Sequence, residues 1–93
     1  MTLRPAVAGD VFWRFTFMVS PPIRARLIDT LRAAGLLASA WYPPVQHLFV
    51  PGASASDFPG AAAFGESVVN LFTDHRVDTA AARRAVSVIN QFA

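Results

Sequence analysis

Two histidines, His47 and His75, are the only imidazole side chains in the sequence, so they are the first candidates for acid–base or metal chemistry. A protein metal site needs three or four ligands, which on a helix recur every three or four residues. No carboxylate stands at that spacing from His47. Asp74 directly precedes His75, so these two side chains point to opposite sides of a strand or into a turn. The sequence therefore predicts no metal site.

A serine nucleophile or a phosphate-binding loop is not indicated either. No G-x-S-x-G pattern surrounds Ser54, Ser56 or Ser67, and Ser56-Asp57 is typical of turn and cap chemistry. Gly60 and Gly65 lack both the G-x-G-x-x-G spacing and the lysine of a P-loop.

The chain contains no lysine, because all 8 of its positively charged side chains are arginines. Schiff-base catalysis needs a primary amine that can lose its proton, and a guanidinium group cannot serve. No side chain of this protein can therefore form such an adduct, and we expect the chain to have no catalytic residue of its own.

The composition predicts a surface that meets a partner. Hydrophobic residues make up 54% of the chain and charged residues 15%, against the roughly 25% charged residues of a typical domain. Eight Phe and 2 Trp are many for 93 residues with so few charges to cover them. We expect part of this apolar surface to contact another copy of the chain or a missing lobe, the alternative being a merely alanine-rich domain.

The isoelectric point near 10.5 does not indicate a nucleic-acid-binding protein. The net charge is only +2, and the arginines are scattered rather than gathered in a basic stripe. No apolar run approaches the roughly 20 residues that span a bilayer, and residues 1–10 lack the apolar segment of a signal peptide. We expect no nucleic acid, no membrane and a cytoplasmic location. The absence of cysteine leaves the redox compartment open.

The first half of the chain predicts a strand, a helix and a second strand. Residues 1–10 are expected to form a loose lead-in, and residues 11–93 a single domain. Apolar residues alternate over 11–19, with Phe15 and Phe17 on one face, which favours a strand. Ser20 and the two prolines after it are typical of a helix start, and Gly35 of a helix end. Residues 36–41 are expected to form a short strand.

The second half predicts a loop, a helix, a strand and a final helix. Residues 45–59 are mostly loop, and a helix is expected from about Pro59 to Ser67, before a strand over 68–72. Asp78 is the expected cap of the last helix, whose inner face should carry Ala82, Ala85, Val86, Ile89 and Phe92. This order favours an α+β fold: a small three-stranded, mostly antiparallel sheet with helices packed on one face.

Large side chains gather in a stretch that is rich in proline, residues 41–49. Loops expose such residues, and interfaces are enriched in Trp and Tyr. Trp41, Leu48 and Phe49 are therefore candidates for contact with a partner.

Two motifs carry a resemblance to a known family. Residues 40–47, Ala-Trp-Tyr-Pro-Pro-Val-Gln-His, follow a predicted helix that ends in Gly35, and residues 68–74 read Val-Val-Asn-Leu-Phe-Thr-Asp. Both resemble the C-terminal small domain of DegT/DnrJ/StrS-type sugar aminotransferases, which depend on pyridoxal phosphate (PLP). That domain has a Tyr-Pro-rich segment closing on His and an Asn-Leu-Pro-Thr-His strand end; Phe72 and Asp74 replace the Pro and His here. Asp57-Phe58-Pro59 also resembles the family's helix entry. The likeness covers about residues 12–92 in the same order.

The resemblance implies an aminotransferase C-terminal-domain-like fold that covers the active-site cleft of a larger domain. In the family, the lysine that holds PLP, the Asp facing the pyridine nitrogen and most phosphate ligands belong to the large domain, and they have no counterpart here. Tyr42 and His47 match positions near the cleft and are the substrate-cleft candidates, the alternative for His47 being a plain loop histidine. Trp41 and Gln46 depart from the pattern.

These expectations lead to two hypotheses. In the first, the chain is a stand-alone or split lobe, inactive alone, that completes the cleft of a lysine-bearing large domain acting on a nucleotide sugar. PLP would then be bound only through that partner, and Arg14 or Arg76 could bind an anionic group. In the second, the chain is a self-associating or small-ligand-binding module that kept the fold and lost the chemistry.

Overall fold

A computed structural model describes residues 2–3, 8–9, 14–41, 49–52 and 54–92 of the chain. Its elements are β1 (Thr2–Leu3), β2 (Arg14–Met18), α1 (Pro21–Ala33), β3 (Ala38–Ser39), the short 3-10 helix η1 (Ala55–Asp57), α3 (Pro59–Ser67), β4 (Val68–Phe72) and α4 (Thr79–Asn90). The predicted small α+β fold is confirmed, and so is its order of strands and helices. Within the described ranges, no helix is both long and apolar enough to cross a lipid bilayer.

The sheet is antiparallel throughout, with the strand order β1-β2-β4-β3. The last strand in the sequence, β4, therefore lies inside the sheet, where it pairs with both β2 and β3. Phe17 of β2 faces Val69 of β4, and Leu71 of β4 lies between Phe15 and Ala38. Residues more than 50 positions apart are thus joined directly, which makes the sheet a product of long-range pairing.

β1 adds a fourth, two-residue strand to the predicted three. It lies within the segment expected to be a loose lead-in, and Thr2 pairs with Met18. The outer edge of β2 would otherwise present unpaired N–H and C=O groups, and this short strand pairs with the end of that edge, at Phe17 and Met18.

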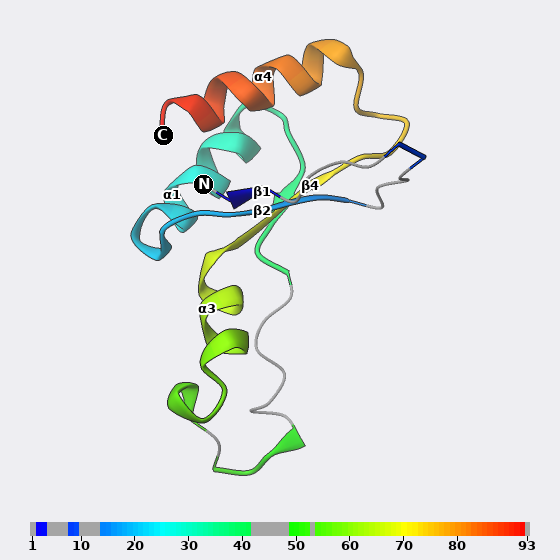
Figure 1. Ribbon diagram of the computed structural model, residues 1–93. Coiled ribbons are helices and arrows are strands. Elements are labelled where there is room, and N and C mark those ends of the chain that lie inside the picture. Colours follow the sequence, from blue (N-terminus) through cyan, green and yellow to red (C-terminus); the bar gives the residue numbers. More distant parts are fainter. Residues whose placement is uncertain (1, 4–7, 10–13, 42–48, 53, 93) are drawn as a thin grey trace.

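One face of the sheet carries the hydrophobic core, and α1 and α4 both cover that face (Figure 1). Because side chains alternate along a strand, Phe17 and Val69 point together toward the helices. Phe17 is 1% exposed and Val69 is fully buried. The residues of this core are Phe17, Val19, Leu27, Ile28, Leu31, Leu36, Ala38, Val69, Ala81, Ala85, Val88 and Ile89.

Helix α1 begins after Ser20 with two prolines in its first turn and ends at the predicted glycine. Gly35 has a φ of 81°, the left-handed conformation that glycine adopts without strain. Its N–H donates to the carbonyl of Arg32, and the N–H of Leu36 donates to that of Leu31, each at 3.0 Å. This is the Schellman pattern, which turns Leu36 back to pack with Leu31 in the core.

Helix α4 begins at the predicted cap but turns a different face inward from the one expected. The Asp78 carboxylate accepts a hydrogen bond from the N–H of Ala81 at 2.7 Å, which confirms the cap. Ala81, Ala85, Val88 and Ile89 are buried. Ala82 and Val86, which were assigned to the inner face, are exposed, so that part of the prediction is wrong. The apolar stripe of α4 includes more residues than pack against the core, and the periodicity of the sequence alone does not show which of them are buried.

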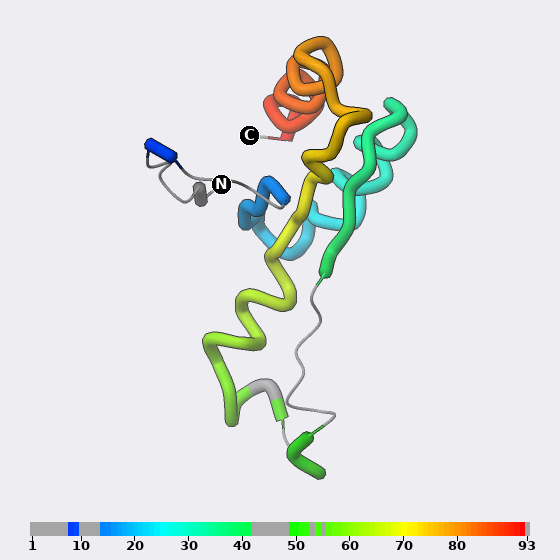
Figure 2. The backbone as a smooth tube through the Cα atoms, turned by 90° about the vertical axis from the view of Figure 1, so that its right-hand side faces the viewer, coloured from blue at the N-terminus to red at the C-terminus, as the bar shows by residue number. Residues whose placement is uncertain are grey.

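Helix α3 directly precedes β4 and extends from the first residue of that strand away from the rest of the molecule (Figures 1 and 2). We call residues Ser54–Ser67, which comprise η1 and α3, the α3 arm. The molecule measures 45 × 31 × 20 Å, and its radius of gyration of 14.6 Å exceeds the roughly 12 Å expected for a compact domain of this length. Arg24 of α1 donates a hydrogen bond to the carbonyl of Gly65, which fixes the base of the arm.

Two leucines of different burial test this account of the core. Leu31 is fully buried and Leu37 is 44% exposed. We expect Leu31→Ala to lower the free energy of unfolding by about 2–5 kcal/mol, because it leaves a cavity between α1 and α4. The matched change Leu37→Ala should alter it by only about 0.5 kcal/mol. Urea denaturation followed by circular dichroism measures both, and equal losses would contradict the assignment of the core.

Candidate functional site

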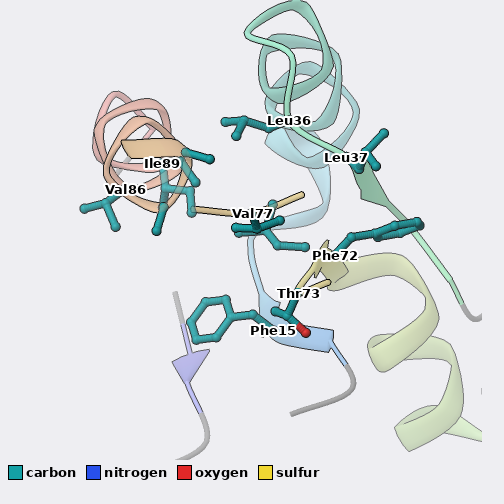
Figure 3. Close-up of a pocket in the computed structure, with 12 residues that line it drawn as sticks. Phe15, Leu36, Leu37, Phe72, Thr73, Val77, Val86 and Ile89 are labelled. Carbon is teal, nitrogen blue, oxygen red and sulfur yellow. The ribbon is translucent and has the colours of Figure 1, made fainter. Parts of the chain in front are cut away.

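An apolar groove of about 290 Å³ lies between α4 and the neighbouring end of the sheet (Figure 3). β2 and β4 form its floor, the segment after α1 forms one side and α4 the other. Its described lining residues are Phe15, Leu36, Leu37, Leu71, Phe72, Thr73, Val77, Ala81, Ala82, Ala85, Val86 and Ile89.

The groove is open because the two helices do not cover the sheet completely. α1 and the core residues of α4 bury Phe17, whereas Phe15, two residues earlier on the same face of β2, is 38% exposed. Leu37 on one lip is 44% exposed, and Val86 on the opposite lip is 57% exposed. Large apolar side chains that surround a hollow in this way are typical of a surface that binds something apolar.

A second, shallower depression lies on the outer side of α4. It measures about 280 Å³ and is lined by Thr79, Ala82, Arg83, Val86, Ser87 and Asn90. Ala82 and Val86 line both depressions, so they form a ridge between the apolar groove and a depression that Arg83 also lines. We call this pair of residues the α4 ridge.

The chemistry of the groove is that of contact rather than catalysis. None of its described lining residues is ionisable, and Thr73 alone carries a polar side chain. Such a surface offers no general acid, no general base and no set of metal ligands. Among the described residues, no group of three or more His, Asp or Glu side chains comes together.

PLP, the cofactor that the family resemblance implies, does not fit this chain. Its aldehyde needs a lysine, and the sequence has none. Its phosphate needs cations or a row of backbone N–H donors, and the groove presents carbon. No step of any reaction is therefore assigned to PLP on this chain.

The predicted contact residues fall partly outside the described part of the chain. This applies to both cleft candidates, Tyr42 and His47, and to Leu48. Trp41 is 53% exposed and Phe49 is 77% exposed, so both are available for contact with a partner. Whether they make such a contact stays a prediction.

A buried asparagine on β4 positions the backbone at Trp41. Asn70 is 5% exposed, and its carboxamide oxygen accepts a hydrogen bond from the Thr16 hydroxyl at 2.7 Å. Its amide group donates to the carbonyl of Trp41. Asn70 thus links β2, β4 and the residue that leaves β3, and it fixes where the residue 41–49 stretch begins.

The turn between β4 and α4 holds an ion pair. The Asp74 carboxylate accepts hydrogen bonds from the backbone N–H of Arg76 at 2.9 Å and from its Nε at 3.0 Å. These hydrogen bonds hold the pKa of Asp74 well below its usual range. His75 is exposed in the same turn. Since the Arg76 guanidinium is already paired with the Asp74 carboxylate, this arginine is a poor candidate for binding a separate anion.

Arg14, the other arginine considered for anion binding, lies over the ring of Phe72 at 4.6 Å from its centre. A guanidinium group in this position is attracted to the face of the ring. The two residues also face each other across β2 and β4, so the contact stabilises the same strand pair as Asn70.

No family model, no curated protein and no solved structure matches this chain.

The sequence reasoning missed the groove, although its residues carried a signal. Val86 and Ala82 were assigned to the core because they are apolar and share the spacing of the inner face. α4 has more apolar residues than one packed face can bury, which indicates that some of them are exposed. These are residues 80–82, 85, 86, 88 and 89.

A dye that fluoresces on apolar surfaces tests whether the groove is open in solution. We expect anilinonaphthalene sulfonate to bind the wild-type chain, and Val86→Asp to lower its fluorescence severalfold by placing a charge on the lip. The matched control is Val50→Asp, because Val50 is 44% exposed and does not line the groove. Equal fluorescence from both variants would show that the dye binds elsewhere.

Proposed function

We propose that this chain is a non-catalytic protein-binding domain that works by packing its apolar groove against another polypeptide. The observation that carries the proposal is the groove itself, whose lips expose Phe15, Leu37 and Val86 and whose described lining has no ionisable side chain. Burial of apolar surface gains about 25 cal/mol for each Å² removed from water. A neighbour that covers the groove therefore stabilises the complex without any chemical step.

The resemblance to DegT-type aminotransferases favours a particular partner. It is a lysine-bearing large domain that holds PLP and whose cleft this chain covers as a separate lobe. Tyr42 and His47 then face the substrate, a nucleotide sugar. Trp41 and Phe49, which are both strongly exposed, add contact area beside the cleft. The lack of lysine agrees with this division, because it leaves the covalent chemistry to the partner.

Self-association is the second candidate function, and the α3 arm favours it. Phe58 is 37% exposed and Phe64 is 41% exposed on an element that extends from the body of the molecule. Exposed aromatic side chains on a protruding element are typical of an arm that docks on another molecule.

Co-expression tests the leading proposal. We expect the chain to co-purify in a one-to-one complex with the large domain of a DegT-type sugar aminotransferase expressed without its own small domain. Val86→Asp should lower the yield of the complex at least about tenfold, the effect of losing about 1.4 kcal/mol, because it puts a charge into an apolar contact. Size-exclusion chromatography with light scattering measures the mass of the complex.

The control for this experiment is Val50→Asp, which should leave the yield unchanged because Val50 lies outside the groove. Failure of the wild-type chain to bind the large domain would reject the lobe assignment. A complex that survives Val86→Asp would instead show that the groove is not the contact surface.

A further inference from the structure

Most arginines that the structure describes are engaged with other groups of the chain, but two on helix α4 are not. Arg83 and Arg84 are both exposed, and within the described ranges neither has a hydrogen bond, an ion pair or a ring contact. These two guanidinium groups are therefore available to another molecule. The engaged arginines are Arg14 and Arg26 over the rings of Phe72 and Phe92, Arg24 and Arg32 on the carbonyls of Gly65 and Ala38, and Arg76 with Asp74.

Arg83 lies beside the apolar groove. It lines the depression on the outer side of α4, which the α4 ridge separates from the groove. Residues three apart on a helix are neighbours, with about 5–6 Å between their Cβ atoms, so Arg83 adjoins Val86 on the lip of the groove. Arg84 carries the same charge one position further along, yet it lines neither the groove nor the depression.

The acidic side chains described next to the groove are already engaged. Asp78 accepts the hydrogen bond of the Ala81 N–H at the start of α4, and Asp74 is paired with Arg76. No Asp or Glu follows Asp78 in the sequence. The groove's own described lining has no ionisable side chain. The surface thus combines an apolar hollow with an unpaired cation at its edge.

The complement of such a surface is a segment that is both apolar and acidic. Apolar side chains leave water when they enter the groove, and a carboxylate can accept two parallel N–H bonds from a guanidinium group. A nucleic acid offers phosphates to the arginine but no aliphatic side chains to the groove, so a polypeptide is the better match.

We infer that the polypeptide bound by the groove presents an acidic amphipathic segment, with apolar side chains in the groove and an Asp or Glu paired with Arg83 across the α4 ridge. This inference rests on the proposed protein-binding function and specifies the chemistry of the partner. A charge at the rim of an apolar contact selects among partners, because a segment with a basic residue at that point is repelled.

A matched pair of peptides tests this selectivity. Both are fluorescein-labelled helical peptides with the same leucine stripe, flanked by glutamates in one and by lysines at the same positions in the other. By fluorescence anisotropy, the wild-type chain should bind the glutamate peptide at least about tenfold more tightly than the lysine peptide. Arg83→Glu should abolish or reverse this preference, because it reverses the charge at the edge of the groove.

The matched control is Arg84→Glu, which makes the same change of net charge one residue away. It should weaken binding of the glutamate peptide by less than about threefold, since an exposed charge outside the contact acts only through the screened field. Circular dichroism should show the same helix content for both variants and the wild-type chain.

Equal affinity of the wild-type chain for the two peptides overturns the inference, and so does binding of neither peptide. Equal losses from Arg83→Glu and Arg84→Glu overturn it as well, because they would show attraction by net charge alone. Val86→Asp separates this failure from failure of the proposed function. If both peptides bind equally and Val86→Asp abolishes the binding of both, the groove still binds polypeptides and only the preference for an acidic segment is rejected.

Discussion

The pairing of β2 with β4 is the interaction on which the rest of the structure depends. It places Phe17 opposite Val69 on the face that α1 and α4 cover, and Thr16 opposite Asn70 on the other face. The first pair is the centre of the core, and the second holds the backbone where the chain leaves β3. Loop closure over more than 50 residues costs conformational entropy, which the burial of the core and the hydrogen bonds across the strands offset. A change that breaks this pairing would therefore disturb core, groove and the start of the residue 41–49 stretch together.

The same pairing explains why apolar surface remains exposed. A single short sheet covered by two helices buries its centre, while Phe15 near one end of β2 and Val86 on the outer side of α4 stay exposed. α3 follows directly into β4 and so extends from the sheet instead of covering it. Two apolar surfaces, the groove and the α3 arm, are thus left uncovered by the other residues that the structure describes. In a domain with few charges, such surfaces are stable in water only when the chain is dilute or when a partner covers them.

Local signals predicted the elements well, and long-range geometry limited the prediction of the site. Gly35 and Asp78 mark helix ends through conformational and capping preferences of single residues, so the sequence located them directly. The strand at 68–72 was likewise predicted with its observed bounds. The exposure of Val86 depends on where α4 sits over the sheet, which no local pattern contains. Tyr42 and His47 were chosen by family resemblance, and they lie outside the described residues, so their role stays a prediction.

The central claim is that the α3 arm and the groove beside α4 are contact surfaces. Nuclear magnetic resonance of the ¹⁵N-labelled chain tests it most directly, because each amide reports its own surroundings. The spectrum is recorded in a dilution series and again after addition of the large domain of a DegT-type aminotransferase. The account predicts that the amides of Ala82 and Val86 shift in at least one of the two series, with the core amides of Phe17 and Val69 unchanged. A spectrum that is identical at every concentration and unchanged by the large domain, or shifts confined to other surfaces, would contradict it.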